Sequence, residues 1–204
     1  MKPLDPILKI VLPRANHCPE PIAIDSIRTA AITFCERTKL WRSSDKFKVS
    51  NGCNVVAVPY GAVLHQIESA RFDGNPLEPV SLSWLEENYP HWCEVEGIGA
   101  KYITQVEPGT VRVVPSASGE LALTTILKPS NDAEELEDFL IDLYARTLAD
   151  GALAEILAIP GQMFSNPDLA VYYGNRFERE LSSLSSQYVR GQQRAPIRIT
   201  PQFF

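Results

Sequence analysis

The chain has 204 residues, of which 45% are hydrophobic and 22% are charged, a balance typical of a globular protein with one large or two small domains. Its net charge of −6 argues against the broad basic surface with which nucleic-acid-binding proteins displace counterions. The first apolar run is short, since Pro6, Lys9 and Pro13 interrupt it. No other stretch of the sequence approaches the roughly 18 consecutive apolar residues of a membrane span. We therefore expect a soluble protein that is made in a cytoplasm.

The cysteines and histidines do not predict a metal site. The four cysteines lie far apart, without a C-x-x-C pair: Cys18, Cys35, Cys53 and Cys93. His17 lies beside a cysteine and His91 lies two residues before one, but neighbours this close rarely converge on one ion without further ligands. We expect reduced, mostly buried thiols, no bound metal and no cofactor.

The first clear helix signal lies between Pro21 and Trp41. Apolar residues recur there at the spacing of one helical face: Ile27, Ala30, Ala31, Phe34, Cys35 and Trp41. Arg28, Glu36 and Lys39 occupy the opposite face, and bases at the end of the segment suit the negative end of a helix dipole. The pattern predicts a helix that buries its apolar face.

From about residue 47 to residue 127 the pattern changes to β-branched runs separated by turn residues. Strands are predicted at 54–61 and within 63–77, the latter with a tight turn at Asp73 and Gly74. Residues 101–128 predict three more strands, arranged as an antiparallel meander. Between these blocks, Ser81 or Ser83 is a candidate cap for a short helical turn at 84–88.

Helices return after Pro129. One begins among the caps and acids at 130–138, and its apolar residues lie at helical spacing: Leu136, Phe139, Leu140, Leu143 and Thr147. Gly151 within it indicates close helix packing or a bend. Asn166 and Pro167 begin another helix, with the stripe Tyr173, Phe177, Leu181, Leu184 and Tyr188. The short connection predicts antiparallel packing, and the first helix joins this pair.

These elements predict an α+β fold with a discontinuous helical bundle and an inserted module. The bundle comprises residues 17–44 and 130–191, and an antiparallel β-rich insert occupies 45–129. The end of the chain, 192–204, is predicted to be an extended arm. Its prolines, Pro196 and Pro201, exclude a helix interior, and its other residues are largely basic or apolar.

No pattern of residues predicts catalysis. The sequence contains no G-x-S-x-G, G-x-x-x-x-G-K, H-E-x-x-H or G-x-G-x-x-G motif. The densest acidic cluster lies at 132–142 and could hold a cation or act as paired carboxylates, but a solvated first turn that complements a helix dipole is the favoured interpretation. The sequence therefore indicates a structural or binding protein and not an enzyme.

Three stretches together resemble the head-to-tail adaptor, or connector, proteins of tailed bacteriophages: SIRTAAITFCERTKLWR, GALAEILAIPGQMFSNPDLAVYYGNRFE and RFDGNPLEPVSLSWLEENYPHW. The resemblance covers most of the chain, from about Pro19 to Gly191. It is strongest in FCERTKLWR and in GALAEILAIPG followed by NPDLA. These are packing and capping patterns, which are less specific than a metal or phosphate motif.

The resemblance implies a virion protein of the neck, at the head–tail interface, that is assembled in the host cytoplasm. Such proteins form a ring, typically of twelve copies, on the portal protein. The ring extends the channel through which genomic double-stranded DNA passes without sequence-specific binding, and it offers an attachment surface to a downstream tail or neck protein. This chain departs from the compact, mainly helical adaptors in its large β insert.

The resemblance also implies a role for the end of the chain, because these adaptors have a C-terminal arm that reaches into the portal. The residues predicted to dock there are Arg194, Ile197, Arg198, Ile199, Phe203 and Phe204. An extended arm can add to a neighbour's strand while the two phenylalanines fill pockets. Repetition around a ring would multiply this modest contact.

A ring also needs heterologous interfaces between its copies and hence apolar surface beyond the core. Five aromatic residues are candidates, although each one alone is more often a core residue: Trp41, Trp84, Trp92, Tyr172 and Tyr173. An acidic body suits a DNA conduit because a negative wall repels the duplex.

Two alternatives remain at this point. The chain could be another tail-side component, such as a terminator or a part of the tube. It could also be a carbohydrate-binding or hydrolytic module on the β insert, with Trp84 or Trp92 stacking on a sugar and Glu86 and Glu87 as paired carboxylates. Strand and turn core residues explain these side chains more simply.

Overall fold

The computed structural model describes residues 1–50 and 55–188. The chain forms two compact units: residues 1–40 and 129–204 make up the first, and residues 41–128 make up the second. We call them the helical unit and the β unit. With helices and a mixed sheet in one chain, the predicted α+β class is confirmed.

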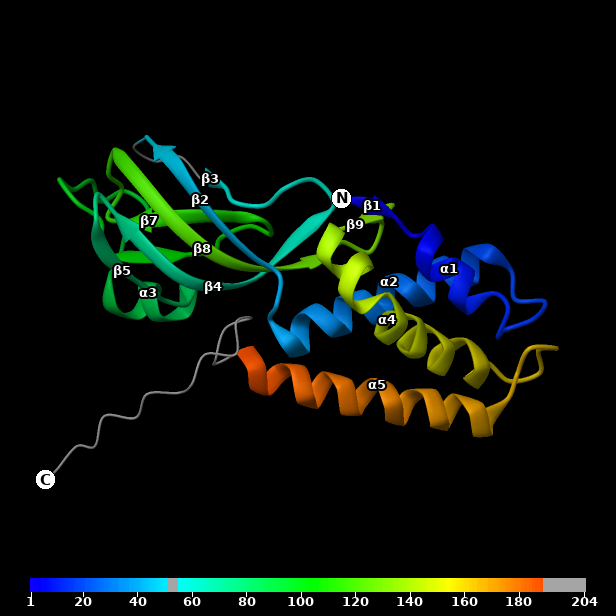
Figure 1. The fold of residues 1–204 in the computed structure, drawn as a ribbon. Coiled ribbons are helices and arrows are strands. Elements are labelled where there is room, and N and C mark those ends of the chain that lie inside the picture. Colours follow the sequence, from blue (N-terminus) through cyan, green and yellow to red (C-terminus); the bar gives the residue numbers. More distant parts are fainter. Residues whose placement is uncertain (51–54, 189–204) are drawn as a thin grey trace, which may run out of the picture. The chain divides into compact units, whose positions relative to one another are not determined.

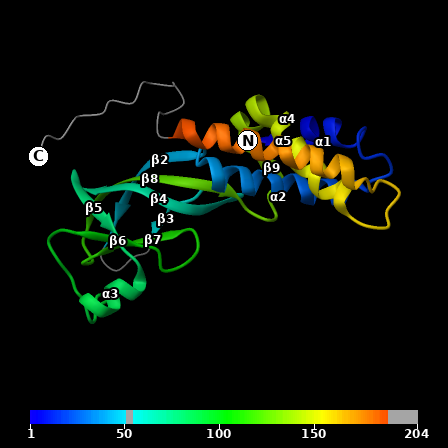
Figure 2. The ribbon, with the colours of Figure 1, turned by 90° about the horizontal axis from the view of Figure 1, so that it is seen from below.

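In the described part of the helical unit, four helices accompany a short two-stranded ribbon, and α5 runs alongside α2 and α4 (Figures 1 and 2). The helices are α1 (Asp5–Val11), α2 (Glu20–Thr38), α4 (Asp138–Ala158) and α5 (Pro167–Tyr188). The ribbon pairs β1 (Lys2–Pro3) with β9 (Glu135–Leu136) in the antiparallel sense. Helix α1 packs on α4 and α2. The first and the last helix of the unit, α1 and α5, therefore both pack on α4.

The core of this unit forms where the apolar face of α2 meets α4 and α5. Ile27, Ala31, Phe34 and Cys35 are fully buried, and Ala30 is nearly so. The ring of Phe34 lies 4.8 Å from that of Tyr144 in α4, measured between centroids. The helical face predicted from the spacing in this segment is therefore confirmed, apart from its last member, Trp41.

Gly151 allows α4 to approach both of its neighbours closely. A Cβ atom at this position would lie 2.9 Å from the Cβ of Ala30 in α2 and 3.0 Å from Cζ of Phe177 in α5. Real Cβ atoms are not found at the first of these separations, so any other residue would push the helices apart. Of the two interpretations of this glycine, close packing is the one that the structure supports.

Helix α2 ends earlier than the sequence predicts. Lys39 adopts a left-handed conformation with φ 53°, and its N–H donates to the carbonyl oxygen of Cys35 at 2.9 Å. This is the αL arrangement that terminates many helices. Trp41 therefore lies beyond the helix, although the sequence pattern placed it on the helical face.

The sequence pattern does not predict helix α1, because prolines interrupt the apolar run in this segment. Pro6 lies in the first turn, where a missing N–H has no helical partner to lose. Ile7, Leu8 and Val11 are buried at helical spacing. The segment is thus a short amphipathic helix that covers α4.

Helix α4 also differs from its prediction. It begins at Asp138, after Glu137 in the N-cap position, so residues 130–137 precede the helix. Leu136 is buried in β9, opposite Lys2, and Leu143 is 67% exposed. The predicted face is therefore only partly right. The buried positions of the helix, apart from Asp150 and Gly151, are Leu140, Ile141, Leu148, Ala149, Ala152, Leu153, Ile156 and Leu157.

The β unit is a seven-stranded mixed sheet with one short helix, α3 (Leu82–Asn88), within the residues described. Its strands are β2 (Arg42–Val49), β3 (Val55–Val56), β4 (Ala62–Phe72), β5 (Asn75–Pro79), β6 (Tyr102–Thr104), β7 (Thr110–Val114) and β8 (Gly119–Pro129). Their order across the sheet is β2-β8-β4-β5-β6-β7-β3. The turn at Asp73 and Gly74 is confirmed, since both residues have positive φ between β4 and β5.

The predicted antiparallel meander of the last three strands is wrong. β6 and β7 are antiparallel neighbours, but β8 leaves them and lies between β2 and β4. It pairs with β2 along eight positions, from Arg42 opposite Ile126 to Val49 opposite Gly119. The insert is also not purely antiparallel, because β5 and β6 run parallel.

A small apolar cluster lies where α3 covers the sheet beside β6 and β7 (Figure 2). Its buried members are Leu85, Trp92 and Val114, and Trp84 and Tyr102 pack against them half-buried. The hydroxyl oxygen of Ser81 accepts a hydrogen bond from the Trp84 N–H at 3.2 Å, which confirms one of the two candidate caps. Helix α3 begins at Leu82, two residues before the predicted turn, and ends at Asn88 as expected.

The close contact at Gly151 gives a testable prediction. We expect Gly151→Ala to destabilise the protein by up to about 2 kcal/mol, because forced separation of packed helices costs about 1–3 kcal/mol and alanine regains only roughly 1 kcal/mol in a helix. Urea unfolding would measure it. Gly174→Ala in α5 is the matched control, since a Cβ there meets Ala154 only at 3.6 Å. It should leave stability unchanged or increase it, and a stabilised Gly151→Ala protein would contradict the packing argument.

Candidate functional site

The residues predicted to dock on a partner all lie at 189–204, outside the described residues. They are Arg194, Ile197, Arg198, Ile199, Phe203 and Phe204. The structure does describe α5, the helix that precedes this segment. The candidate site is therefore built from α5 and the loop that leads into it.

Local capping and an apolar stripe explain why α5 forms. The side-chain oxygen of Asn166 accepts a hydrogen bond from the Leu169 N–H at 3.1 Å, and Pro167 occupies the first helical position, as the sequence predicts. Four residues bury the face toward the rest of the unit: Ala170, Phe177, Leu181 and Leu184. Other side chains of the helix are exposed, among them Leu169, Val171 and Tyr172.

Exposed apolar side chains occur in the first turns of α5 and in the loop that precedes it. Met163 in the preceding loop is 85% exposed, and Leu169, Val171 and Tyr172 are 41%, 64% and 51% exposed. We call these four residues the exposed apolar group. Methionine and tyrosine are enriched in protein interfaces, and a cluster of exposed apolar residues is typical of a contact surface.

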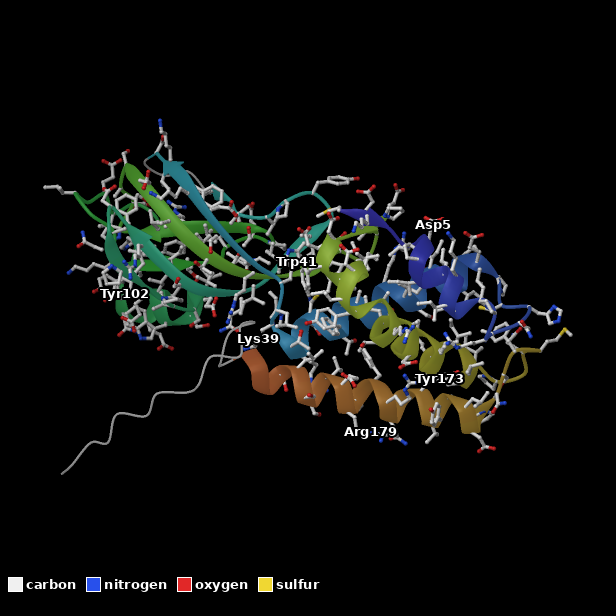
Figure 3. The ribbon with its side chains drawn as sticks, in the orientation of Figure 1. Asp5, Lys39, Trp41, Tyr102, Tyr173 and Arg179 are labelled. Atoms are coloured by element: carbon white, nitrogen blue, oxygen red, sulfur yellow. The ribbon has the colours of Figure 1, made fainter. Side chains whose placement is uncertain are left out.

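The aromatic part of this group is held in place by its neighbours. The rings of Tyr172 and Tyr173 meet edge to face at 5.3 Å, and the guanidinium of Arg176 lies 5.7 Å from the centroid of Tyr172. Figure 3 labels Tyr173 and Arg179 on this helix, with Arg179 on the side turned away from α4. Aromatic and arginine side chains side by side are the commonest anchors of interface energy.

The five aromatic residues considered as interface candidates divide by their exposure. Trp41 and Trp92 are buried in the β unit, and Trp84 and Tyr173 are half-buried. Tyr172 is the exposed one of the five. It is among the aromatic candidates of the sequence, but nothing in the sequence marks the other three members of the exposed apolar group, because each looks like an ordinary core residue.

In the β unit, three aromatic rings pack on one another. Centroid distances are 5.1 Å between Trp84 and Tyr102, 5.9 Å between Trp84 and Tyr89, and 5.3 Å between the two tyrosines. Their hydroxyl oxygens are 3.2 Å apart, and this hydrogen bond raises the pKa of Tyr102. Trp92 is buried, with the guanidinium of Arg112 at 5.5 Å. These rings serve one another as packing partners, which accounts for them without a sugar.

The acidic segment is largely tied to the start of the chain. The N-terminal ammonium lies 3.1 Å from a carboxylate oxygen of Asp138, and the Lys2 Nζ lies 2.6 Å from Oδ2 of Asp142. A hydrogen bond from Ser130 lowers the pKa of Asp132. Among the residues described, no three side chains of histidine, cysteine, aspartate or glutamate gather as a metal site would require.

The cysteines are less uniform than the sequence suggests. Cys18 and Cys35 are buried, in line with the prediction of mostly buried thiols, and Cys93 is exposed. Burial strongly raises the pKa of Cys35. Cys53 lies outside the described residues.

No helix in the described ranges combines the length and apolar character that crossing a membrane requires. No protein-family model matches the sequence, and no curated protein matches it. Function is therefore inferred from the residues themselves and from their arrangement in the two units.

The different burial of the thiols is testable by alkylation followed by mass spectrometry. In the native protein, we expect Cys93 to react with iodoacetamide, because its side chain is exposed. Cys35 should stay unmodified under the same conditions, because its buried thiol resists ionisation. Both should react in denaturant, and early modification of Cys35 in the native state would contradict the packing of α2.

Proposed function

We propose that this protein is a non-enzymatic structural component of a tailed-bacteriophage virion. It forms a ring, with twelve copies as the family pattern, under the portal protein and joins the capsid to the tail. In this proposal the helical unit is the discontinuous bundle of the adaptor family, the β unit is an insert in it, and residues 192–204 are the docking arm.

The observation that carries the proposal is the exposed apolar group at the start of α5. Met163, Val171 and Tyr172 expose more than half of their surface in the single chain. A closed ring joins one surface of each copy to a different surface of the next, so each copy must present apolar area that its own core does not use. A helix that also leads into the predicted arm would connect contacts between copies to contacts with the portal.

Charge supports the part of the proposal that concerns DNA. The net charge of −6 gives a body that repels the duplex, which suits a passage and does not suit a protein that grips DNA. Genomic DNA is accordingly proposed to pass without sequence-specific binding. The portal protein, neighbouring copies and a downstream tail or neck protein are the proposed partners.

The alternative of a tail-side component predicts different binding. A terminator or tube protein would bind tail tubes and leave isolated portal rings alone. The decisive experiment mixes purified portal rings with the full chain, and with a chain stopped after Gly191, and examines both by negative-stain microscopy. Added density with the full chain alone would support the adaptor and the arm, whereas density with neither would support the tail-side alternative.

The arm itself can be tested by point substitution. We expect Phe203→Ala combined with Phe204→Ala to weaken binding to portal rings while leaving the melting temperature unchanged, since the proposed role of these rings is in a partner's pockets. Ile98→Ala, an exposed apolar residue of the β unit, is the matched control and should bind normally. A large fall in melting temperature would show instead that the two phenylalanines support the core.

The exposed apolar group gives a separate prediction. We expect Val171→Glu combined with Tyr172→Glu to prevent ring formation on the portal and to change the unfolding free energy by only about 0.5 kcal/mol, as is usual for exposed positions. The control pair, Tyr60→Glu and Ile98→Glu, changes the same charge at exposed apolar residues of the β unit. Equal loss of rings in both pairs would contradict the assignment of the interface to α5.

A further inference from the structure

The helical unit contains a hollow of about 580 Å³. Helices α1, α4 and α5 and the turn after α1 contribute to its lining. Four of the lining residues are cations: Lys9, Arg14, Arg146 and Arg176. In a chain whose acids outnumber its bases, such a concentration of positive charge calls for an explanation.

One carboxylate lies among these cations. Asp150 is 6% exposed, and its Oδ2 lies 3.0 Å from Nη2 of Arg176. Burial raises the pKa of Asp150, while the charges of Arg176 and Arg14 act in the opposite direction. A buried carboxylate keeps its charge only with such partners, so Asp150 and Arg176 hold one another in place at the wall of the hollow.

Among the residues described, the other three cations form no such ion pair, although the charge of Arg14 also acts on Asp150. Arg14 donates from Nη1 to the carbonyl oxygen of Ile10 at 3.0 Å, which orients it without neutralising it. Within residues 1–50 and 55–188, no carboxylate lies within 4.0 Å of the charged nitrogens of Lys9, Arg14 or Arg146. The hollow therefore carries an excess of positive charge from three different elements of the unit.

We propose that this hollow is a binding site for a phosphate-bearing ligand with two or more negative charges. Guanidinium groups present paired N–H donors that match the oxygens of phosphate, and the hollow holds three of them with one ammonium. Like charges held close together repel one another, and a bound multivalent anion offsets this repulsion by its attraction to each cation. A single carboxylate of a protein partner would leave most of this charge uncompensated.

The size and the lining of the hollow define the ligand further. Its volume lies in the usual range for small-molecule sites, about 300–1,000 Å³. The apolar part of the lining is aliphatic, from Ile10 and Pro13, and no lining residue is aromatic. A nucleobase would thus find no ring on which to stack, so recognition acts on phosphate groups. These belong either to a free polyphosphate or to the backbone of a nucleic acid.

The test is calorimetric titration of the full chain with pyrophosphate at low ionic strength. We expect binding at one site per chain and a melting temperature that rises with ligand concentration. Lys9→Gln combined with Arg146→Gln should weaken binding by about tenfold or more, because two charge-assisted contacts are removed. Both side chains are exposed, so this variant should melt like the unmodified chain when no ligand is present.

The matched control is Lys48→Gln combined with Lys101→Gln, two exposed lysines of the β unit that change the net charge equally. It should bind pyrophosphate as the unmodified chain does. A short DNA duplex is then added as a competitor: displacement of pyrophosphate identifies a nucleic-acid backbone as the source of the phosphate, and retention identifies a free polyphosphate.

Three results would overturn the proposal. The first is no pyrophosphate binding by the unmodified chain, which needs no variant to interpret. The second is equal weakening in the control pair, which would show diffuse attraction to a charged surface. The third combines two observations: the unmodified chain does not bind phosphate, and Arg146→Glu changes its self-association in sedimentation. That result would make the hollow a contact for an acidic protein surface.

Discussion

The helical unit depends on how closely α4 approaches two other helices at Gly151. Ala30 and Phe177 lie at the limit of contact with this position, although more than a hundred residues separate Ala30 from Gly151. Helices α2 and α4 can pack this closely only if the residues between them in the chain fold outside the helical core. Residues 41–128 therefore form a compact body of their own, and the helices on either side of it form one core.

Elements with short-range causes could be predicted from the sequence. The face of α2 around Phe34 follows from helical spacing, and the turn at Asp73 and Gly74 follows from residues that tolerate positive φ. The cap at Ser81 and the start of α5 at Asn166 follow from side chains that bond to nearby N–H groups. In each case the cause and its effect lie within a few residues.

What could not be predicted depends on partners far away in the chain. β2 is a polar edge strand without alternation, and only its pairing with β8 makes it a strand. β8 in turn pairs with β2 and β4 and not with β7, the strand that precedes it in the chain. The hollow is hidden in the same way, since Lys9, Arg146 and Arg176 form no motif along the sequence and meet only through the packing of α1, α4 and α5.

The pairing of β2 with β8 has a consequence for how such a chain can change over evolutionary time. The chain enters the β unit through β2 and leaves it through β8, and these two strands are neighbours. Where they begin and end, the Leu127 N–H donates to the carbonyl oxygen of Trp41 at 2.8 Å. Its two ends thus lie side by side, as the ends of a hairpin do. A module joined in this way can be lengthened, shortened or exchanged as one block of coding sequence while the helices keep their register.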